Sequence, residues 1–359
     1  MKQDIRISNY QLALLLMGFV IGSMAVYNPV SGAHQDGWIA LMIGLVGGFI
    51  LLGVYIYISV LNPNKTLIEI LKINFGNYLG SLIGGLYLLY FIHIAAMVVR
   101  KYSEFVVTVV YPQTPTYIVI GLFLIAVVYA VKQGLEVLTR VNELLMPFLF
   151  ILVIVFFILL KGLYNPKFLF PILEEGLKPI LKASLIVTTY PFGETVIFLM
   201  IFPFLKGREK IIKTSMMALA IVGIFLMAFT LRDIMVLGDA FADNALFPSQ
   251  LTAKLIPRVE IAPLIAVILI IAGGVRLTIS IFSISLGLTQ LINLDDYKPF
   301  ISPIAVLIVV LSLWIYDNII DMTSWIVDYW PLYSLPFQVI IPVILLITSY
   351  LRRKRMGKV

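Results

Sequence analysis

Thr188-Thr189-Tyr190-Pro191-Phe192-Gly193-Glu194 lies in the middle of an apolar run, from about 181 to 205, that is long enough to cross a bilayer. Pro191 removes a backbone donor, Gly193 tolerates many backbone conformations, and Glu194 is costly at the bilayer centre unless a partner compensates its charge. Proline and glycine alone would also fit an ordinary kink in a membrane helix. The carboxylate favours a helix that is broken for function.

The composition is that of a polytopic membrane protein. Of the 359 residues, 61% are hydrophobic and 13% are charged, and the mean hydropathy is +1.04. Apolar runs of the ~20 residues that a helical span needs recur along the whole chain, so we expect a single membrane domain over residues 1–359. A transmembrane β-barrel is excluded because its strands alternate polar and apolar residues. The chain has no cysteine, which excludes disulfides and thiolate metal sites.

Polar and turn-forming clusters divide the chain into ten predicted spans. These spans are residues 10–30, 38–61, 79–108, 116–132, 141–161, 181–205, 214–236, 260–288, 300–316 and 333–351. An even number places both termini on one side, and the larger share of Lys and Arg there predicts that this side is cytoplasmic. The basic tail, residues 352–359, contributes much of the net charge of +7. We attribute the tail to orientation and contact with anionic lipid, and we expect no nucleic acid partner.

Ten spans also form two halves of five, about residues 1–161 and 181–351. Because five is an odd number, the two halves have opposite topology in the membrane. Inverted repeats of this kind hold their ligands near the bilayer midplane, on interrupted helices in matching positions. Gly22-Ser23 lies about twelve residues into the first span, and Gly193 lies about twelve residues into the sixth. We therefore predict an all-α integral membrane protein of ten transmembrane helices, a 5+5 inverted repeat with broken helices 1 and 6.

A helix break exposes unpaired backbone N–H groups at one half-helix start and unpaired C=O groups at the other half-helix end. The N–H groups suit a carboxylate and the C=O groups suit an ammonium or a metal cation, so together they suit an amino acid zwitterion. The predicted ligand-binding residues are Gly22, Ser23, Met24, Tyr190, Phe192, Gly193, Glu194, Arg276 and Ser280. Glu194 has three possible roles: it accepts a ligand ammonium, it is a proton-linked switch, or it pairs with Arg276.

Other polar residues within the spans carry weaker signals. His93 lies near the centre of the third span, where a lone histidine is more often a packing residue than part of a pocket. Ser280 is on the same span as Arg276, but serine hydroxyls also bond to the preceding turn of their own helix. Arg100 and Glu104 are four residues apart, which predicts an ion pair near the outer mouth. Residues 168–184 and 238–258 predict two short amphipathic helices at the outer surface.

Catalytic motifs are absent from the sequence. There is no Walker loop, no Gly-x-Ser-x-Gly and no His-Glu-x-x-His, and the two histidines, His34 and His93, are far apart. We therefore expect no enzyme activity, no catalytic residue, no cofactor and no bound metal.

Short motifs occur in a defined order across nearly the whole chain. They are Ile7-Ser8-Asn9-Tyr10-Gln11, Asp36-Gly37-Trp38-Ile39, Asn62-Pro63-Asn64-Lys65-Thr66-Leu67-Ile68-Glu69-Ile70, Gly134-Leu135-Glu136-Val137-Leu138-Thr139-Arg140 with Glu143 and Pro147, Phe192-Gly193-Glu194 and Pro203-Phe204-Leu205. In this order and spacing the chain resembles the B-subunit permease-like (GerAB-type) proteins of bacterial spore germinant receptors, a branch of the amino acid/polyamine/organocation (APC) transporter superfamily.

The resemblance implies a LeuT-like fold with unwound first and sixth helices. It also implies sensing of nutrient germinants such as amino acids in the spore inner membrane, together with A and C subunits. The site that it implies is the Gly22-Ser23-Met24 break and the Tyr190 to Glu194 break, with the eighth span facing them. Superfamily transporters often carry a glycine-rich first-helix signature, of which this chain retains Gly22.

Two other functions use the same scaffold: proton-coupled amino acid transport, with Glu194 as the proton carrier, and a water- or ion-conducting pore. For the site itself, we expect Gly193→Val to block the germinant response and leave the protein level unchanged.

Overall fold

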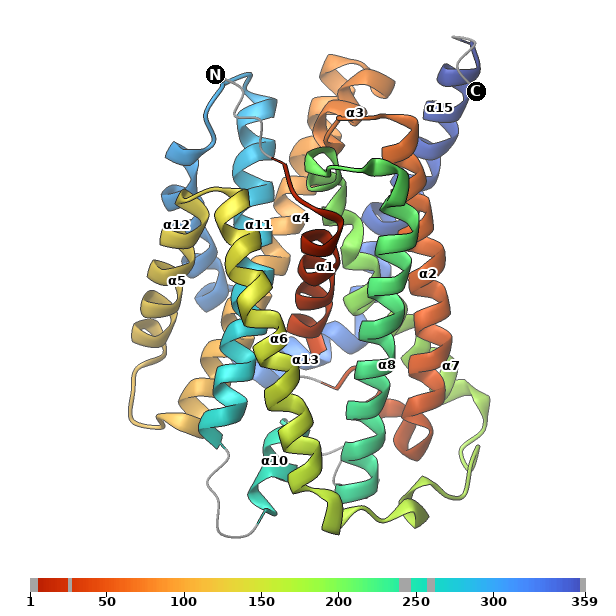
Figure 1. The fold of residues 1–359 in the computed structure, drawn as a ribbon, viewed down its shortest axis with the longest axis vertical. Coiled ribbons are helices and arrows are strands. Elements are labelled where there is room, and N and C mark those ends of the chain that lie inside the picture. Colours follow the sequence, from red (N-terminus) through yellow and green to blue (C-terminus); the bar gives the residue numbers. More distant parts are fainter. Residues whose placement is uncertain (1–5, 25–27, 239–246, 257–261, 356–359) are drawn as a thin grey trace.

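The computed structural model describes residues 6–24, 28–238, 247–256 and 262–355. Its long helices run along one bundle (Figure 1), and the start of α1 (Asn9–Met24) lies at the same end of the bundle as the end of α15 (Ile341–Arg355). Both ends of the described chain thus lie at one end of the bundle, as an even number of crossings requires. The cytoplasmic location of that end stays a prediction.

Helices account for nearly all of the described chain. After α1, the first half contains α2 (Gly37–Leu61), α3 (Leu67–Phe75), α4 (Asn77–Phe105), α5 (Thr116–Lys132) and α6 (Leu135–Leu159). The second half contains α7 (Leu177–Val187), α8 (Ile211–Leu237), α10 (Pro248–Lys254), α11 (Ala262–Leu291), α12 (Lys298–Trp314), α13 (Ile319–Asp328), α14 (Trp330–Leu335) and α15. Short 3₁₀ or π turns are η1 (Ser31–Asp36), η2 (Val106–Val110), η3 (Lys161–Leu163), η4 (Pro166–Leu169), η5 (Thr188–Phe192), η6 (Gly193–Met200), η7 (Phe202–Phe204), η8 (Arg208–Lys210) and η9 (Pro336–Ile340).

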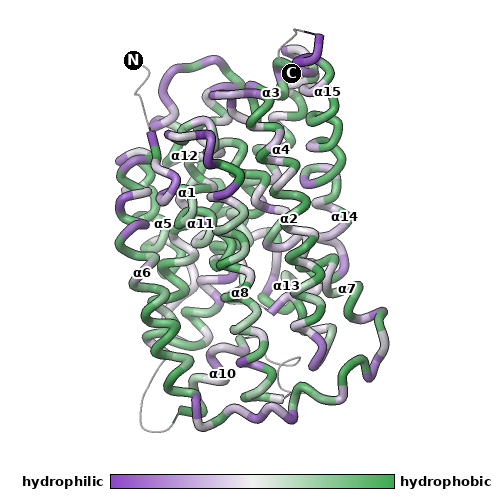
Figure 2. The backbone as a smooth tube through the Cα atoms, turned by 45° about the vertical axis from the view of Figure 1, so that its right-hand side comes forward, coloured by the Kyte–Doolittle hydropathy of each residue, from purple (hydrophilic) through white to green (hydrophobic). Residues whose placement is uncertain are grey.

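The helices match the ten predicted spans. Seven helical segments of the described chain are long and apolar enough to cross a membrane, and α12 with α13, bent by 92°, forms an eighth. The apolar helices α1 and α5 are shorter and supply the remaining two. Figure 2 shows hydrophobic residues along most of the helices and hydrophilic residues concentrated toward the two ends of the bundle. The predicted all-α, multi-pass architecture is confirmed.

Local sequence signals set several helix boundaries. At the start of α3, the Thr66 hydroxyl accepts the Glu69 N–H, and the Glu69 carboxylate accepts the Thr66 N–H. This reciprocal capping box satisfies two donors that the helix start would leave unpaired. Gly76, with φ of 81°, then separates α3 from α4 in a conformation that other residues rarely adopt. The motif of residues 62–70 therefore determines where α3 begins.

Two helices are buried along most of their length. Every residue from Leu14 to Ser23 in α1 is buried, as is every residue from Thr189 to Pro203 in the sixth span. Most other spans have one face exposed toward the surroundings of the bundle, as lipid-facing helices do. The two helices predicted to be broken are therefore among the innermost ones.

One boundary differs from the sequence-based expectation, and two surface segments match it in part. The described part of α1 reaches Met24, residues 25–27 lie outside the described chain and residue 28 is not helical, so the first helix stops short of residue 30. The first predicted surface helix is wrong in part, because Leu177 already begins α7, the first part of the sixth span. The second contains α10, while residues 239–246 and 257–261 lie outside the described chain.

Candidate functional site

The sixth span is broken at the stretch that the sequence singled out. Regular α-helix ends at Val187, a π turn (η5) follows, and the chain continues as the 3₁₀ helix η6 from Gly193. Tyr190 has φ of −133° and ψ of 105°, which is extended rather than helical backbone. Pro191, which has no backbone N–H, follows at this point of irregular backbone. The prediction of a broken sixth helix is therefore confirmed.

The carboxyl end of α1 faces this break. Carbonyl groups in the last turn of a helix have no partner within the helix and need one from outside. The Gly22 carbonyl accepts a hydrogen bond from the Tyr102 hydroxyl at 2.8 Å. The Ser23 carbonyl accepts one from Lys101 Nζ at 2.9 Å and one from the Tyr190 hydroxyl at 3.0 Å. Side chains from α4 and η5 therefore hold the backbone carbonyls of Gly22 and Ser23.

Gly22 allows α1 to approach α11 closely. A Cβ atom at Gly22 would lie 2.6 Å from the Ala272 carbonyl oxygen and 3.1 Å from Arg276 Cβ. Any larger residue would push the two helices apart. The glycine therefore positions the end of α1 against Arg276.

A buried ion pair links three of the inner helices. Arg276 of α11 donates to Glu194 of η6, and both side chains are fully buried. Arg276 also donates to the Ser23 hydroxyl and, at 3.1 Å, to the carbonyl of Phe19, both in α1. The structure thus brings Ser23, Glu194 and Arg276 together, and of the roles considered for Glu194 it shows the pairing.

The pair leaves polar atoms without partners. Among the described residues, Glu194 Oε1 and Arg276 Nε are buried and have no hydrogen-bond partner. Such atoms are costly in a protein interior. Glu194 Oε1 can therefore accept a hydrogen bond from an ammonium or hydroxyl group of a bound molecule.

Lys101 is a site residue that sequence reasoning missed. It lies near the end of the predicted third span, residues 79–108, where a basic residue gives no sign of a site, but in α4 its side chain is only 1% exposed. Its ammonium contacts the Tyr190 hydroxyl and lies 4.6 Å from the centre of the Tyr190 ring. The signal that could have identified Lys101 is the ion pair of Arg100 and Glu104, whose N–O distance is 2.6 Å. These two residues share one face of α4, so Lys101 lies on a different face.

A second missed group satisfies the broken backbone of the sixth span. Gln338 of η9 is fully buried, and its amide donates to the Thr189 carbonyl at 2.8 Å and to the Tyr90 hydroxyl at 2.7 Å. The Tyr55 hydroxyl contacts the carbonyl oxygens of Gly193 at 3.1 Å and of Gln338 at 2.7 Å. A glutamine in the last predicted span was the signal that could have indicated this contact.

The remaining predicted residues lie apart from this cluster. Phe192 is buried toward α2, where a Cβ atom at Gly48 would lie 2.7 Å from it. The Ser280 hydroxyl donates to the Arg276 carbonyl in its own helix at 3.0 Å. His93 lies 3.1 Å from the Tyr333 hydroxyl and 2.8 Å from that of Tyr316. His93 therefore occupies the structural, hydrogen-bonded position that was the alternative to a pocket.

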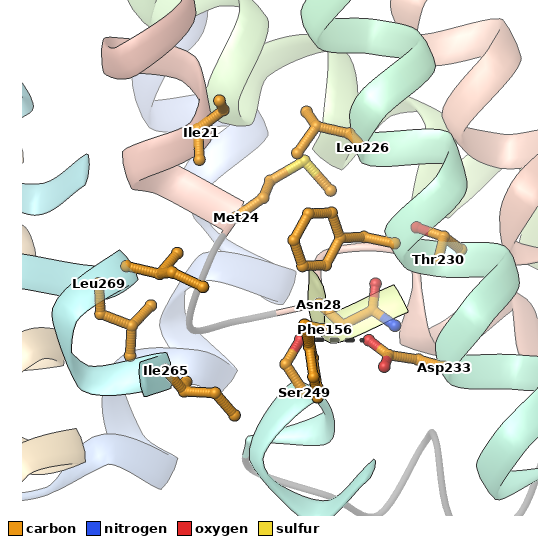
Figure 3. Close-up of a pocket in the computed structure, with 12 residues that line it drawn as sticks. Ile21, Met24, Asn28, Phe156, Leu226, Thr230, Asp233, Ser249, Ile265 and Leu269 are labelled. Atoms are coloured by element: carbon orange, nitrogen blue, oxygen red, sulfur yellow. Dashed lines mark hydrogen bonds between the residues drawn. The ribbon is translucent and has the colours of Figure 1, made fainter. Parts of the chain in front are cut away.

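Met24 lines a small cavity below the end of α1 (Figure 3), with a volume of about 40 Å³. Its wall is mostly apolar, with polar side chains gathered on one side. The polar lining residues are Asn28, Thr230, Asp233 and Ser249.

Beside this cavity lies a second buried ion pair, between Arg232 and Asp233 at 2.6 Å. Arg232 also donates to the Ser249 hydroxyl of α10 at 2.6 Å. Arg232, near the end of the predicted span 214–236, is fully buried.

The fold and the sequence both have known relatives. The family of spore germination proteins matches residues 6–322. The chain is 33% identical, over 98% of its length and 97% of the relative, to spore germination protein KB of Bacillus subtilis (strain 168).

Two solved structures share the fold at low identity. The nucleobase-cation-symport-1 family transporter Mhp1, in a closed conformation with bromovinylhydantoin bound, has a TM-score of 0.75 at 13% identity, covering 98% of this chain and 80% of that one. MhsT in complex with L-phenylalanine has a TM-score of 0.58 at 14% identity, covering 95% and 97%. The predicted LeuT-like fold is confirmed, and by sequence the chain belongs to the spore germination protein family.

Proposed function

We propose that this chain is the germinant-sensing membrane subunit of a spore germination receptor. It binds a small amino acid-like ligand between the end of α1 and the break in the sixth span, and signals to A and C subunits in the spore inner membrane. The observation that carries the proposal is the buried cluster of Ser23, Glu194 and Arg276, which joins α1, η6 and α11. Ion pairs are seldom placed between innermost membrane helices without a functional reason.

The geometry suits a site in which ligand binding changes the contacts between helices. Glu194 Oε1 is available to a ligand, while Oε2 is held by Arg276. A ligand that bonds to Oε1 redistributes the hydrogen bonds that Arg276 makes to Ser23 and Phe19 of α1. Binding energy is thereby coupled to the relative positions of three helices, which is what a shift between two conformations requires.

The relatives are consistent with this function. Mhp1 and MhsT, which share the fold, are proteins with a small molecule bound. The family to which this chain belongs is named for spore germination.

Proton-coupled amino acid transport is the second candidate, because Mhp1, which shares the fold, is a transporter. In this case Glu194 would carry the proton. Purified protein in liposomes would then show saturable uptake of an amino acid that depends on a proton gradient. The receptor function predicts binding without such uptake.

The test uses spores of the organism that carries this gene, in which the gene is replaced by one that encodes a variant. Glu194→Gln removes the charge that holds Arg276, so we expect loss of the response to the nutrient that the unmodified gene confers. Glu104→Gln is the matched control, since Glu104 belongs to the more peripheral pair with Arg100. Immunoblots of the spore membrane check the protein level. A full response from Glu194→Gln spores would overturn the proposed site.

A further inference from the structure

A cavity of about 480 Å³ lies between α4, η2, α5 and α11, apart from the Glu194 and Arg276 pair. Among the described residues that line it, none is charged, and all are apolar except two tyrosines, a serine and a threonine. An apolar cavity of about 150 Å³ already binds benzene, and this one has about three times that space. The cavity therefore has room for a hydrocarbon chain and offers no charged group to an amino acid zwitterion. We refer to it as the α4–α5 cavity.

The α4–α5 cavity opens toward the surroundings of the bundle. Three of its lining residues, which we call the floor residues, are at most 2% exposed: Val99, Ser103 and Ile120. At the mouth, Leu122 of α5 is 66% exposed and Ile270 of α11 is 47% exposed. Both helices are apolar spans, so the mouth faces lipid hydrocarbon. The cavity is therefore continuous with the protein–lipid interface, and acyl chains are the molecules that reach it.

Tyr102 connects this cavity to the end of α1. Its ring lines the cavity and stacks on Phe123 of α5, with 6.1 Å between the ring centroids and 28° between the ring planes. Its hydroxyl donates to the Gly22 carbonyl at 2.8 Å. A Cβ atom at Gly273 of α11 would lie 2.4 Å from Tyr102 Cζ, so this glycine leaves space for the ring beside α11. One side chain thus reaches from the wall of the cavity to α1.

The contents of the cavity decide how firmly the Tyr102 ring is held. Atoms that line a void lose the dispersion contacts that close packing provides. A hydrocarbon chain in the cavity supplies these contacts to the ring and keeps the hydroxyl at the Gly22 carbonyl. A ring that turns into the cavity breaks this hydrogen bond and leaves a buried carbonyl group without that donor, which is costly.

We infer that the α4–α5 cavity binds one acyl chain of a membrane phospholipid, and that the bound chain holds Tyr102 against the end of α1. The lipid chain thereby controls the carbonyl group of Gly22, the neighbour of Ser23 in the buried cluster. This lipid site is separate from the proposed germinant site, because its lining contains neither Glu194 nor Arg276.

Occupancy of the cavity is tested by photocrosslinking in liposomes of phosphatidylglycerol that carries a diazirine on one acyl chain. Mass spectrometry locates the adducts, and we expect them on the floor residues as well as on exposed ones. Ala126→Phe fills the cavity from α5 and should remove most floor adducts. Ile125→Phe is the matched control, because Ile125 is 69% exposed and does not line the cavity.

Three results would overturn the lipid site. The first is a set of adducts confined to exposed residues such as Leu122. The second is equal labelling of the floor residues in Ala126→Phe and Ile125→Phe. The third is displacement of the floor adducts by free amino acids, because the cavity would then bind a germinant and not a lipid chain.

The link to α1 is tested by hydrogen exchange of the purified protein in cholate, a detergent with a rigid sterol body in place of a long alkyl chain. Exchange is measured before and after the addition of phosphatidylglycerol. In wild type we expect the lipid to slow exchange of the backbone amides in the last turns of α1. Tyr102→Phe keeps the ring in the cavity and removes the hydroxyl, so this slowing should be lost. The same slowing in Tyr102→Phe as in wild type would overturn the link.

Discussion

Gly193→Ala tests the packing of the broken helix most sharply. Gly193 has φ of −65° and ψ of −26°, so alanine meets no backbone penalty there. Its Cβ atom, however, would lie 2.0 Å from Gln338 Oε1 and 2.5 Å from Gln338 Cδ. Ordinary contacts begin near 3.4 Å, so the Gln338 amide must move by more than an ångström.

This movement breaks the two hydrogen bonds that the Gln338 amide makes, to the Tyr90 hydroxyl at 2.7 Å and the Thr189 carbonyl at 2.8 Å. Each buried polar group left without a partner costs about 1–3 kcal/mol. Overpacking of the site adds about 1–3 kcal/mol. The sum is about 3–9 kcal/mol, which contradicts the expectation that filling this glycine leaves the protein level unchanged.

The assay is a double-mutant cycle read by thermal unfolding of the detergent-purified protein. Gly193→Ala should lower the melting temperature by about 4–12 °C, from an unfolding entropy of about 2.1 cal/mol/K per residue. Gln338→Ala alone removes the two hydrogen bonds. The double variant should be no less stable than the less stable of the two single variants. Both substitutions lose the same hydrogen bonds, and without the Gln338 side chain the added Cβ atom has nothing to collide with. The cycle should therefore give a coupling free energy of about 1–3 kcal/mol.

Gly85→Ala is the matched control, because no heavy atom lies within 4 Å of the added Cβ in this helical position. It should be neutral or slightly stabilising, since alanine is the better helix former. A Gly193→Ala variant as stable as Gly85→Ala, or strictly additive effects in the cycle, would refute the reasoning.

Three further predictions follow from the buried polar contacts. Glu194→Gln should destabilise the protein by about 3–5 kcal/mol because Arg276 is left without its counter-ion. The double variant Glu194→Gln/Arg276→Gln should have a higher melting temperature than Glu194→Gln alone. A lower melting temperature for the double variant would contradict the pairing. His93→Phe should cost about 1–3 kcal/mol through the unpaired tyrosine hydroxyls but keep ligand-induced stabilisation, whose loss would place His93 in the ligand site. Ser249→Ala should raise hydrogen exchange in α10, and unchanged exchange would show that the contact with Arg232 does not hold that helix.

Much of the architecture was predictable because membrane spans are encoded by long apolar runs. The same logic found Glu194 and Arg276, since charged residues stand out in such runs and need partners. Pro191 and Gly193 located the break because of their known backbone properties. In each case the signal is local, and the physical cost of the residue in a bilayer identifies it.

Lys101 shows what the local signal lacks. A basic residue near the end of a predicted span is readily assigned to the outside, and only the direction of the Lys101 side chain, toward Ser23 of α1, shows otherwise. The contact of Gln338 with the Thr189 carbonyl likewise depends on packing between distant segments. Such contacts require the three-dimensional arrangement, because sequence gives neither helix rotation nor the closeness of two helices.

The most direct test of the central claim is a thermal shift screen of the purified protein with the twenty amino acids and a set of sugars and nucleosides. It is repeated with Glu194→Gln/Arg276→Gln and, as a control in the neighbouring cavity, with Thr230→Ala. A ligand at a hundred times its Kd stabilises the native state by about 2.7 kcal/mol. We predict that one or two compounds stabilise wild type and Thr230→Ala but not the double variant. A shift that persists in the double variant would contradict a ligand site at the junction of α1, η6 and α11.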